Sequence, residues 1–267
     1  MKIGVISDIH VDRNKDFPVL ERLAGKMAEK ALDGLVIAGD ISNNQRVTLD
    51  FIDRVTALSG RPVYFVPGNH DMWRDEKNPA GTAELYERYR AHPACLIGKS
   101  VPLAGGWVLL GDIGWYDYSF GNKGYTQEEF ERKSMLNRTW QDSVFIDWKQ
   151  PDPQVHRRML DRLEQQLADT AGKQRIAVTH MVTDGSFTVP ESRAPWPYFN
   201  AFLGSGEYGA LFESSGVRYS IMGHVHYRKR LEKNGVAYIC SCLNYHTEWR
   251  GGDFERELDE ALTVISL

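Results

Sequence analysis

Five short polar clusters, each placed directly after an apolar run, constrain the fold of this chain more than any other feature. The clusters are Asp8-Ile9-His10, Gly39-Asp40, Gly68-Asn69-His70-Asp71, Thr179-His180 and Gly223-His224-Val225-His226. Each apolar run has the length and composition of a short β-strand. Because parallel strands deliver their C-terminal ends to one edge of a sheet, residues far apart in the sequence can converge there.

The N-terminal part of the chain predicts a βαβαβ unit. Short apolar runs at 3–7, 35–38 and 63–66 alternate with segments of helical spacing at 17–31 and 47–58. Further on, the patterns predict strands at 107–110, 176–178, 219–222 and 262–265, a hairpin at 230–240, and helices at 127–140 and 155–167. Residues 183–205 are rich in proline, glycine and aromatic residues and predict a long loop.

Composition narrows the class of protein. The chain has 267 residues, a net charge of −4 and 25% charged residues, which is ordinary for a globular protein and argues against a dedicated nucleic-acid surface. Three cysteines without a disulfide-like pattern favour a reducing compartment. No apolar segment has the pattern of a secretory signal or the length of a membrane span, so we expect a cytoplasmic protein without a membrane partner.

The clusters contain hard oxygen ligands and borderline nitrogen ligands. Aspartate, asparagine and histidine side chains together suit Mn²⁺, Fe and Zn²⁺ rather than a thiolate site. A carboxylate such as that of Asp40 has two oxygens and can bridge two cations. Two ions roughly 3.5–4 Å apart can clamp a phosphate group, generate hydroxide and stabilise a leaving oxygen.

The ordered set of five motifs resembles the calcineurin-like metallophosphoesterases. That resemblance implies a four-layer αββα sandwich of two mixed β-sheets flanked by helices. It also implies one domain over residues 1–267, with a loop insertion at about 183–205 over the site. Asp8, His10 and His226 would hold one metal ion and Asn69, His180 and His224 a second, with Asp40 bridging them. His70 would be the catalytic acid, oriented by Asp71, and the nucleophile would be a hydroxide held by the two metal ions.

Substrate contacts are less constrained by the sequence. Aromatic clusters that contain Trp73, Trp115, Tyr116 and Trp196 could wall a pocket, although ordinary packing explains each of them as well. Arg74 could clamp a phosphate group. His246 follows the predicted strand that ends near residue 242 and could lie at the rim of the site. These six residues are the candidate substrate contacts.

The sequence thus predicts a metal-dependent phosphoesterase that acts on a small phosphomonoester or phosphodiester. One alternative is a protein serine/threonine phosphatase, but the arginines typical of that subgroup are absent directly after Asp40 and Asn69-His70-Asp71. The other alternative is a non-catalytic protein-interaction scaffold, which the intact ligand set disfavours. The metal identities, the oligomeric state and the physiological substrate stay open.

Overall fold

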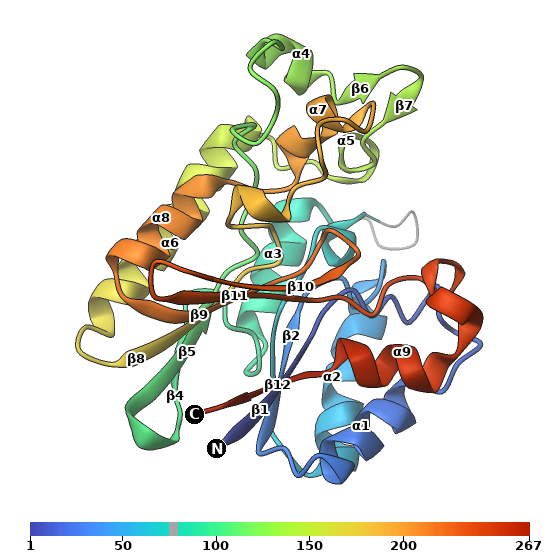
Figure 1. Ribbon diagram of the computed structural model, residues 1–267, viewed down its shortest axis with the longest axis vertical. Coiled ribbons are helices and arrows are strands. Elements are labelled where there is room, and N and C mark those ends of the chain that lie inside the picture. The colour runs from blue at the N-terminus through green and yellow to red at the C-terminus, as the bar shows by residue number, and fades with distance from the viewer. Residues whose placement is uncertain (75–79) are drawn as a thin grey trace.

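Two β-sheets packed face to face form the centre of the computed structural model, which describes residues 1–74 and 80–267 (Figure 1). The first sheet contains, in spatial order, β12 (Thr263–Ser266), β1 (Lys2–Ile6), β2 (Gly34–Ala38) and β3 (Val63–Val66). The second contains β10 (Arg228–Lys233), β11 (Val236–Ser241), β9 (Val217–Met222), β8 (Gln174–Val178), β5 (Trp107–Gly111) and β4 (Ser100–Pro102).

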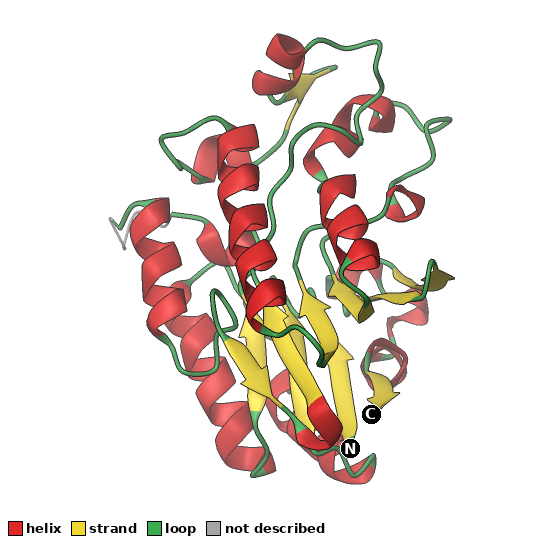
Figure 2. Ribbon diagram, turned by 90° about the vertical axis from the view of Figure 1, so that its left-hand side faces the viewer, coloured by secondary structure: helices red, strands yellow, loops and turns green. Residues whose placement is uncertain are grey.

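Both sheets combine neighbouring parallel strands with antiparallel edge strands, one in the first sheet and two in the second. In the first sheet β1, β2 and β3 are parallel and β12 is antiparallel to β1. In the second, β5, β8, β9 and β11 are parallel, whereas the edge strands β4 and β10 are antiparallel to their neighbours. Parallel strands therefore end on a common side, where the loops and short helices gather (Figure 2).

The core between the sheets explains why these strands are apolar on both faces. Ile3, Val5 and Val36 of the first sheet share one buried cluster with Ile176 and Val178 of the second. Complete burial of a side chain of this size contributes about 1.5–3 kcal/mol. Strands covered on both sides read as continuous apolar runs, which is the pattern seen in the sequence.

Helices cover the outer face of each sheet (Figure 1). The helices on the first sheet are α1 (Val19–Glu29), α2 (Gln45–Ser59), α3 (Thr82–Ala91) and α9 (Phe254–Ala261). Those on the second are α6 (Asp152–Asp169) and α8 (Gly206–Ser214). Helix, sheet, sheet and helix form the four layers of the predicted sandwich, and this prediction of the fold is confirmed.

The two sheets are joined directly beside the strand ends. Ser7, immediately after β1, forms a parallel bridge with Cys242, immediately after β11. The backbone N–H of Ser7 donates to the carbonyl oxygen of Ser241 at 2.9 Å, and that of Leu243 donates to the oxygen of Ser7 at 2.9 Å. This junction brings the loop after β1 next to the loop after β9.

The predicted helix at 127–140 is wrong in its second half. Helix α4 (Gln127–Glu131) is short, and β6 (Ser134–Met135) and β7 (Arg138–Thr139) form a hairpin after it. The two turn residues, Leu136 and Asn137, have φ values of 49° and 60°, as a two-residue type I′ turn requires. The backbone N–H of Ser134 donates to the hydroxyl of Tyr198 at 3.1 Å, so a partner distant in sequence holds this segment.

Several elements were not expected from periodicity. Helices α3, α8 and α9 and the edge strand β4 have no counterpart in the predicted pattern. The segment 183–205, expected as a loop, contains α7 (Trp196–Phe199) and the short 3₁₀ turns Gly185–Phe187 and Asn200–Phe202. Helix α5 (Asp142–Phe145) follows the β6–β7 hairpin.

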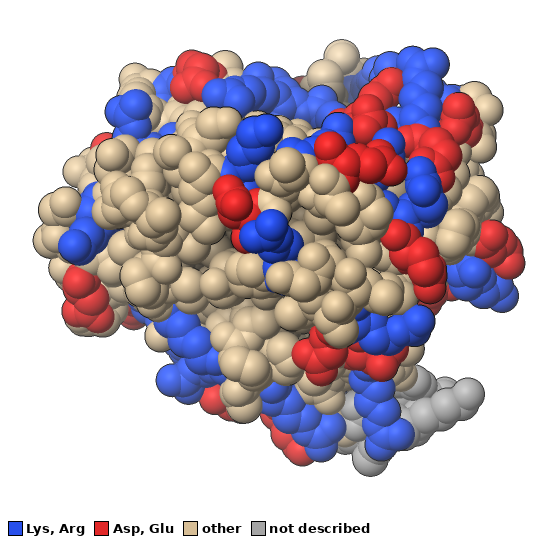
Figure 3. Space-filling model, turned by 90° about the horizontal axis from the view of Figure 1, so that it is seen from below, with Lys and Arg blue, Asp and Glu red and all other residues tan. Residues whose placement is uncertain are grey.

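Charges of both signs are interspersed on the lower face of the molecule (Figure 3). Between α1 and α9, Arg22 pairs with Glu255 at 2.6 Å and Lys30 pairs with Asp259 at 2.9 Å. Exposed pairs of this kind contribute about 0–1 kcal/mol each. In the described parts of the chain, no helix combines the length and apolar character needed to cross a membrane.

The absence of a side chain at Gly68 lets the loop after β3 touch the loop after β2. A Cβ atom at this position would lie 2.1 Å from Asp40 Oδ1 and 2.4 Å from the Asp40 backbone nitrogen. We expect Gly68→Ala to lower the Tm by roughly 5 °C or more, because overpacking of this kind costs about 1–3 kcal/mol. Thermal melting followed by circular dichroism measures the change.

Gly25→Ala is the matched control for this substitution. Gly25 lies within α1, and a Cβ atom there would meet nothing within 4 Å. Alanine is the better helix former by about 1 kcal/mol, so this variant should keep or slightly raise the Tm. Equal melting temperatures for the two variants would contradict the close approach at Gly68.

Candidate metal centre

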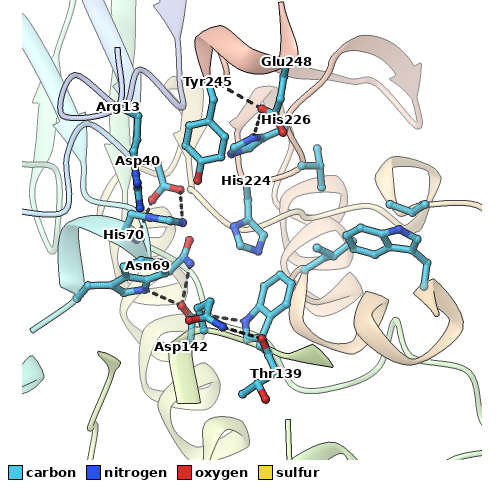
Figure 4. A pocket seen from close by; sticks show the side chains of 17 residues that line it. Arg13, Asp40, Asn69, His70, Thr139, Asp142, His224, His226, Tyr245 and Glu248 are labelled. Atoms are coloured by element: carbon cyan, nitrogen blue, oxygen red, sulfur yellow. Dashed lines mark hydrogen bonds and ion pairs between the residues drawn. The ribbon is translucent and has the colours of Figure 1, made fainter. Parts of the chain in front are cut away.

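The five polar clusters meet at the common end of the two sheets, beside a cavity of about 670 Å³ (Figure 4). Asp40, Asn69, His70, His224 and His226 line this cavity. The remaining predicted ligands Asp8, His10 and His180 lie behind them with no exposed surface. The sequence therefore predicted correctly which distant segments the fold brings together.

One group of side chains surrounds a single point below the cavity. Asp8, His10, Asp40 and His226 each offer a ligand atom, and these atoms all lie within 4.8 Å of one another. His10 Nε2 is 3.7 Å from Asp40 Oδ2, and His226 Nε2 is 3.6 Å from Asp8 Oδ1. A small cation could contact all four atoms after slight adjustment.

A second group shares Asp40 with the first. Asp40, His180 and His224 again offer ligand atoms within 4.8 Å of one another. The side-chain oxygen of Asn69 lies 3.0 Å from His180 Nε2, and Asp40 Oδ1 lies 3.3 Å from the same nitrogen. Because Asp40 belongs to both groups, its carboxylate could bridge two cations.

Hydrogen bonds on the far side of the imidazoles test whether this donor set fits a metal. His180 Nδ1 lies 2.9 Å from the carbonyl oxygen of Ala38, which can only accept, so the ring proton sits on Nδ1 and Nε2 presents a lone pair. That lone pair faces the oxygens of Asn69 and Asp40, so three acceptors point at one place. With Nε2 unprotonated, these converging acceptors need a cation between them, and the residues fit a metal ion.

The first group repeats this arrangement. His226 Nδ1 is 2.8 Å from Glu248 Oε2, and its Nε2 approaches His10 Nε2 at 3.2 Å. An imidazole that donates one ring N–H to a carboxylate presents its second nitrogen as a more basic metal ligand. Glu248 was not recognised in the sequence, because it lies in a short 3₁₀ turn (His246–Glu248) with no strand-end pattern before it.

The electrostatics of the site favour positive charge. Burial alone would raise the pKa of Asp40, but His180, His70 and His10 hold it well below its usual range. Burial opposes protonation of His180, yet Asp40 and its hydrogen bond raise the pKa of His180 to about 10. In the absence of a metal ion, a proton on His180 thus supplies the charge that the acceptors require.

Five of the predicted ligands have a left-handed backbone. The φ values are 51° at Asp8, 44° at His10, 54° at Asp40, 73° at His224 and 52° at His226. Each such conformation costs on the order of 1–3 kcal/mol for a residue other than glycine. The surrounding sheets and hydrogen bonds must compensate this strain, which turns each side chain from the strand end into the site.

His70 lies at the cavity edge, with 13% of its side chain exposed and Nε2 4.0 Å from Asp40 Oδ2. Its ring stacks on Trp73, with centroids 3.8 Å apart and planes 29° apart. Its Nδ1 lies 2.8 Å from the side-chain oxygen of Asn43. Asn43 therefore determines the orientation of the ring.

The prediction that Asp71 contacts and orients His70 is wrong. The Asp71 carboxylate instead accepts from the backbone N–H groups of Gly68, Ile41 and Ser42 at 2.8–3.2 Å and from Thr48 Oγ1 at 2.7 Å. Burial and the nearby Asp40 raise the pKa of Asp71 to about 6. Its place is between the loops after β2 and β3, which it ties together, and it affects His70 only through that backbone.

The structure divides the candidate substrate contacts. Trp73 and Trp196 line the cavity as expected. Trp115 and Tyr116 do not, because both are fully buried in the core, where Trp115 Nε1 donates to Asp152 at 2.8 Å. Their strand-end position suggested the cavity, but the chain after β5 turns them under it.

Arg74 is also misplaced by the sequence pattern. Its guanidinium pairs with Asp147 at 3.3 Å and lies outside the cavity lining. Arg13, from the loop that follows the first cluster, lines the cavity in its place. The sequence contains no signal for this exchange, because the direction of an arginine on a loop depends on its tertiary neighbours.

His246 does not line the cavity either, whereas its neighbour Tyr245 does. His246 Nδ1 lies 3.1 Å from the backbone oxygen of Arg13 on the outer surface. The Tyr245 ring packs against the rings of His10 and His226, with centroid distances of 4.5 Å and 4.7 Å. The expected position was correct to within one residue, and the wrong side chain was chosen.

The chain belongs to the calcineurin-like phosphoesterase family, whose model matches residues 1–228. Solved structures of similar fold include a phosphopantetheinyl hydrolase, PptH, from Mycobacterium tuberculosis, with a TM-score of 0.71, 20% identity, and coverage of 99% of this chain and 95% of that chain. The protein TT1561 of Thermus thermophilus has a TM-score of 0.55 and 12% identity, with coverage of 98% of this chain and 97% of that chain. A dimetal phosphatase from Danio rerio has a TM-score of 0.53 and 16% identity, with coverage of 90% of this chain and 86% of that chain. No curated protein matches the chain.

The geometry predicts a measurable response to metal ions. We expect Mn²⁺ added to chelator-treated protein at 100 times its Kd to stabilise the fold by about 2.7 kcal/mol per site, which raises the Tm by roughly 5–10 °C. His224→Gln should reduce this rise, because it removes one ligand atom of the second group. His92→Gln, which changes a histidine outside the cavity, should respond like the unmodified protein. A Tm that is independent of Mn²⁺ contradicts the metal-centre assignment.

Proposed function

We propose that this protein is a two-metal phosphoesterase that hydrolyses a small phosphomonoester or phosphodiester. The observation that carries the proposal is the position of Asp40 in both groups of ligand atoms, directly at the floor of an open cavity. The family uses divalent metal ions, and its members with this fold include phosphate-ester hydrolases.

The proposed ligands divide as the geometry groups them. Asp8, His10 and His226 would hold one ion, Asn69, His180 and His224 the other, and Asp40 both. Two bound ions such as Mn²⁺, Fe or Zn²⁺ would neutralise the phosphate, activate water and stabilise the leaving oxygen. Glu248 would hold the His226 ring so that Nε2 faces its ion.

His70 is the proposed general acid. Because the oxygen of Asn43 accepts from Nδ1–H, a proton for the leaving oxygen would be carried by Nε2, at the edge of the cavity beside Asp40. From there it can pass to the leaving oxygen of the ester, while stacking on Trp73 fixes the plane of the ring. His70 thus acts on the organic side of the scissile bond.

The rest of the cavity divides into a polar rim and an apolar wall. Tyr245 lies beside His226 and Arg13 lies beside Asp40 and His70, where a hydroxyl and a guanidinium can hold phosphate oxygens. Val189, Trp196 and Leu203 add apolar side chains to the cavity lining, and all three come from the segment 183–205. This arrangement favours an ester whose organic part is apolar or aromatic, with the 183–205 segment covering it.

The two alternative functions are less well supported. For a protein phosphatase, arginines near the phosphate would be expected from the loops after β2 and β3, but Ile41 and Ser42 occupy the first loop and Arg74 pairs with Asp147. A non-catalytic scaffold gives no reason for five strained ligand residues beside a cavity. Both remain outcomes of the activity test.

The test is hydrolysis of a panel of esters by purified protein with Mn²⁺. The panel contains aryl phosphomonoesters and phosphodiesters, cyclic nucleotides, glycerophosphodiesters and a phosphopantetheinyl ester, the last because PptH is named for it. We expect turnover of at least one member, and loss of turnover with weaker binding of both ions in Asp40→Asn. Turnover that survives Asp40→Asn excludes the bridging role, and an inactive parent protein with no bound metal excludes the proposed function.

His70→Ala separates proton transfer from metal binding. We expect this variant to retain both metal ions while turnover falls by about 10²–10⁴-fold, because a general acid contributes that much. Asn43→Ala should show a smaller fall with the same metal content, since it only frees the ring. Elemental analysis alongside kinetics provides the measurement, and loss of metal from His70→Ala would identify His70 as a ligand instead.

A further inference from the structure

One buried carboxylate, that of Asp142, connects the metal centre to the aromatic wall of the cavity. Asp142 is the first residue of α5 and is 1% exposed. Its Oδ1 accepts from Asn69 Nδ2 and Trp73 Nε1, both at 2.9 Å. Its Oδ2 accepts from Trp140 Nε1 at 2.9 Å and from the hydroxyl of Tyr116 at 3.5 Å. Figure 4 shows the bonds from the cavity-lining residues converging on Asp142.

All four partners of this carboxylate are uncharged donors. A buried charge is costly unless hydrogen bonds compensate it, so the four donors are what make the ionised form tolerable here. Conversely, the carboxylate satisfies indole N–H groups that would otherwise be buried without an acceptor. Such a group needs every partner in place, which makes it a rigid connection.

We propose that Asp142 is a positioning residue that orients the amide of Asn69 toward the second metal ion and holds two indoles in the cavity wall. This inference rests on the proposed function. It assigns a role to a residue outside the five motifs, in a segment that no strand-end pattern indicates.

The effect on Asn69 follows from the two ends of its amide. Because Nδ2 donates to Asp142, the amide oxygen must point the other way, and it lies 3.0 Å from His180 Nε2. An amide without this partner could rotate by 180° and present N–H groups to the ion. Asp142 thus decides which atom of Asn69 is available as a ligand.

The two indoles bonded to Asp142, those of Trp73 and Trp140, each contact a histidine ring of the site. Trp73 stacks on His70 with centroids 3.8 Å apart. Trp140 meets His224 edge to face, with centroids 5.7 Å apart and planes at 75°. Both indoles line the cavity. A substrate group that displaced either indole would therefore disturb a carboxylate bonded to the metal-ligand amide.

Asp142→Asn tests the inference with almost no change of shape. The new amide keeps one acceptor oxygen. If that oxygen accepts from Asn69 and Trp73, the N–H₂ group of the new side chain faces the N–H of Trp140. We expect the affinity for the second equivalent of Mn²⁺ to fall by about 10–100-fold, the usual effect of losing such a partner. The kcat should fall with it, while far-ultraviolet circular dichroism stays unchanged.

Asp152→Asn is the matched control. Asp152 is also a buried carboxylate that accepts from an indole, that of Trp115, and from the hydroxyl of Tyr118. Unlike Asp142 it also pairs with a charged group, Lys133, at 2.8 Å, and it lies outside the cavity lining. Its substitution should lower the Tm and leave Mn²⁺ affinity and kcat as in the parent protein. A general effect of removing a buried carboxylate would instead appear equally in both variants and would overturn the inference.

Trp140→Phe in the Asp142→Asn background adds a rescue experiment. The phenyl ring has no N–H group, so the donor–donor conflict disappears, and we expect part of the lost Mn²⁺ affinity to return. Unchanged Mn²⁺ affinity and kcat in Asp142→Asn, or no recovery in the double variant, would refute the positioning role. Failure of the proposed function looks different, because the parent protein itself would then bind no metal or hydrolyse no ester.

Discussion

The convergence of acceptors on Asp40 is the constraint on which the rest of this structure depends. One carboxylate faces imidazoles from the loops after β1, β3, β8 and β9, and none of these imidazoles carries a permanent positive charge. A metal ion, or in its absence a proton on His180, is required to balance this arrangement. The parallel strands of the two sheets make it possible, because they bring together strand ends that are far apart in sequence, such as those that carry His10 and His226, 216 residues apart.

Holding such a centre together has a cost that the fold distributes over its loops. Left-handed backbone at five ligand residues and closely approaching loops would not persist in a flexible chain. Asp71 gives much of the compensation, because it ties the loops after β2 and β3 through backbone N–H groups. A carboxylate inside a ligand motif can thus serve the backbone rather than the neighbouring histidine, and Asn43 takes over the role expected for it.

The aromatic side of the cavity is organised by the same principle as the metal side. A buried carboxylate, Asp142, gathers donors from the loop after β3, the chain after β5 and the β6–β7 region. Under the proposed function, substrate selection and metal binding would therefore be physically connected. In the proposed function, the apolar side chains of the 183–205 segment would make the organic part of an ester, rather than its phosphate, the basis of specificity.

The sequence by itself determined most of the strands, the parallel order of the first three of them, and the side chains that gather around Asp40. It could do so because strand ends are marked locally, by an apolar run followed by a polar residue. Only the tertiary structure decided that Trp115 and Tyr116 are core, that Tyr245 and Arg13 replace His246 and Arg74, and that Asn43, Asp142 and Glu248 support the site. These residues lie on loops and short helices, where the direction of a side chain depends on partners distant in sequence and leaves no periodic pattern.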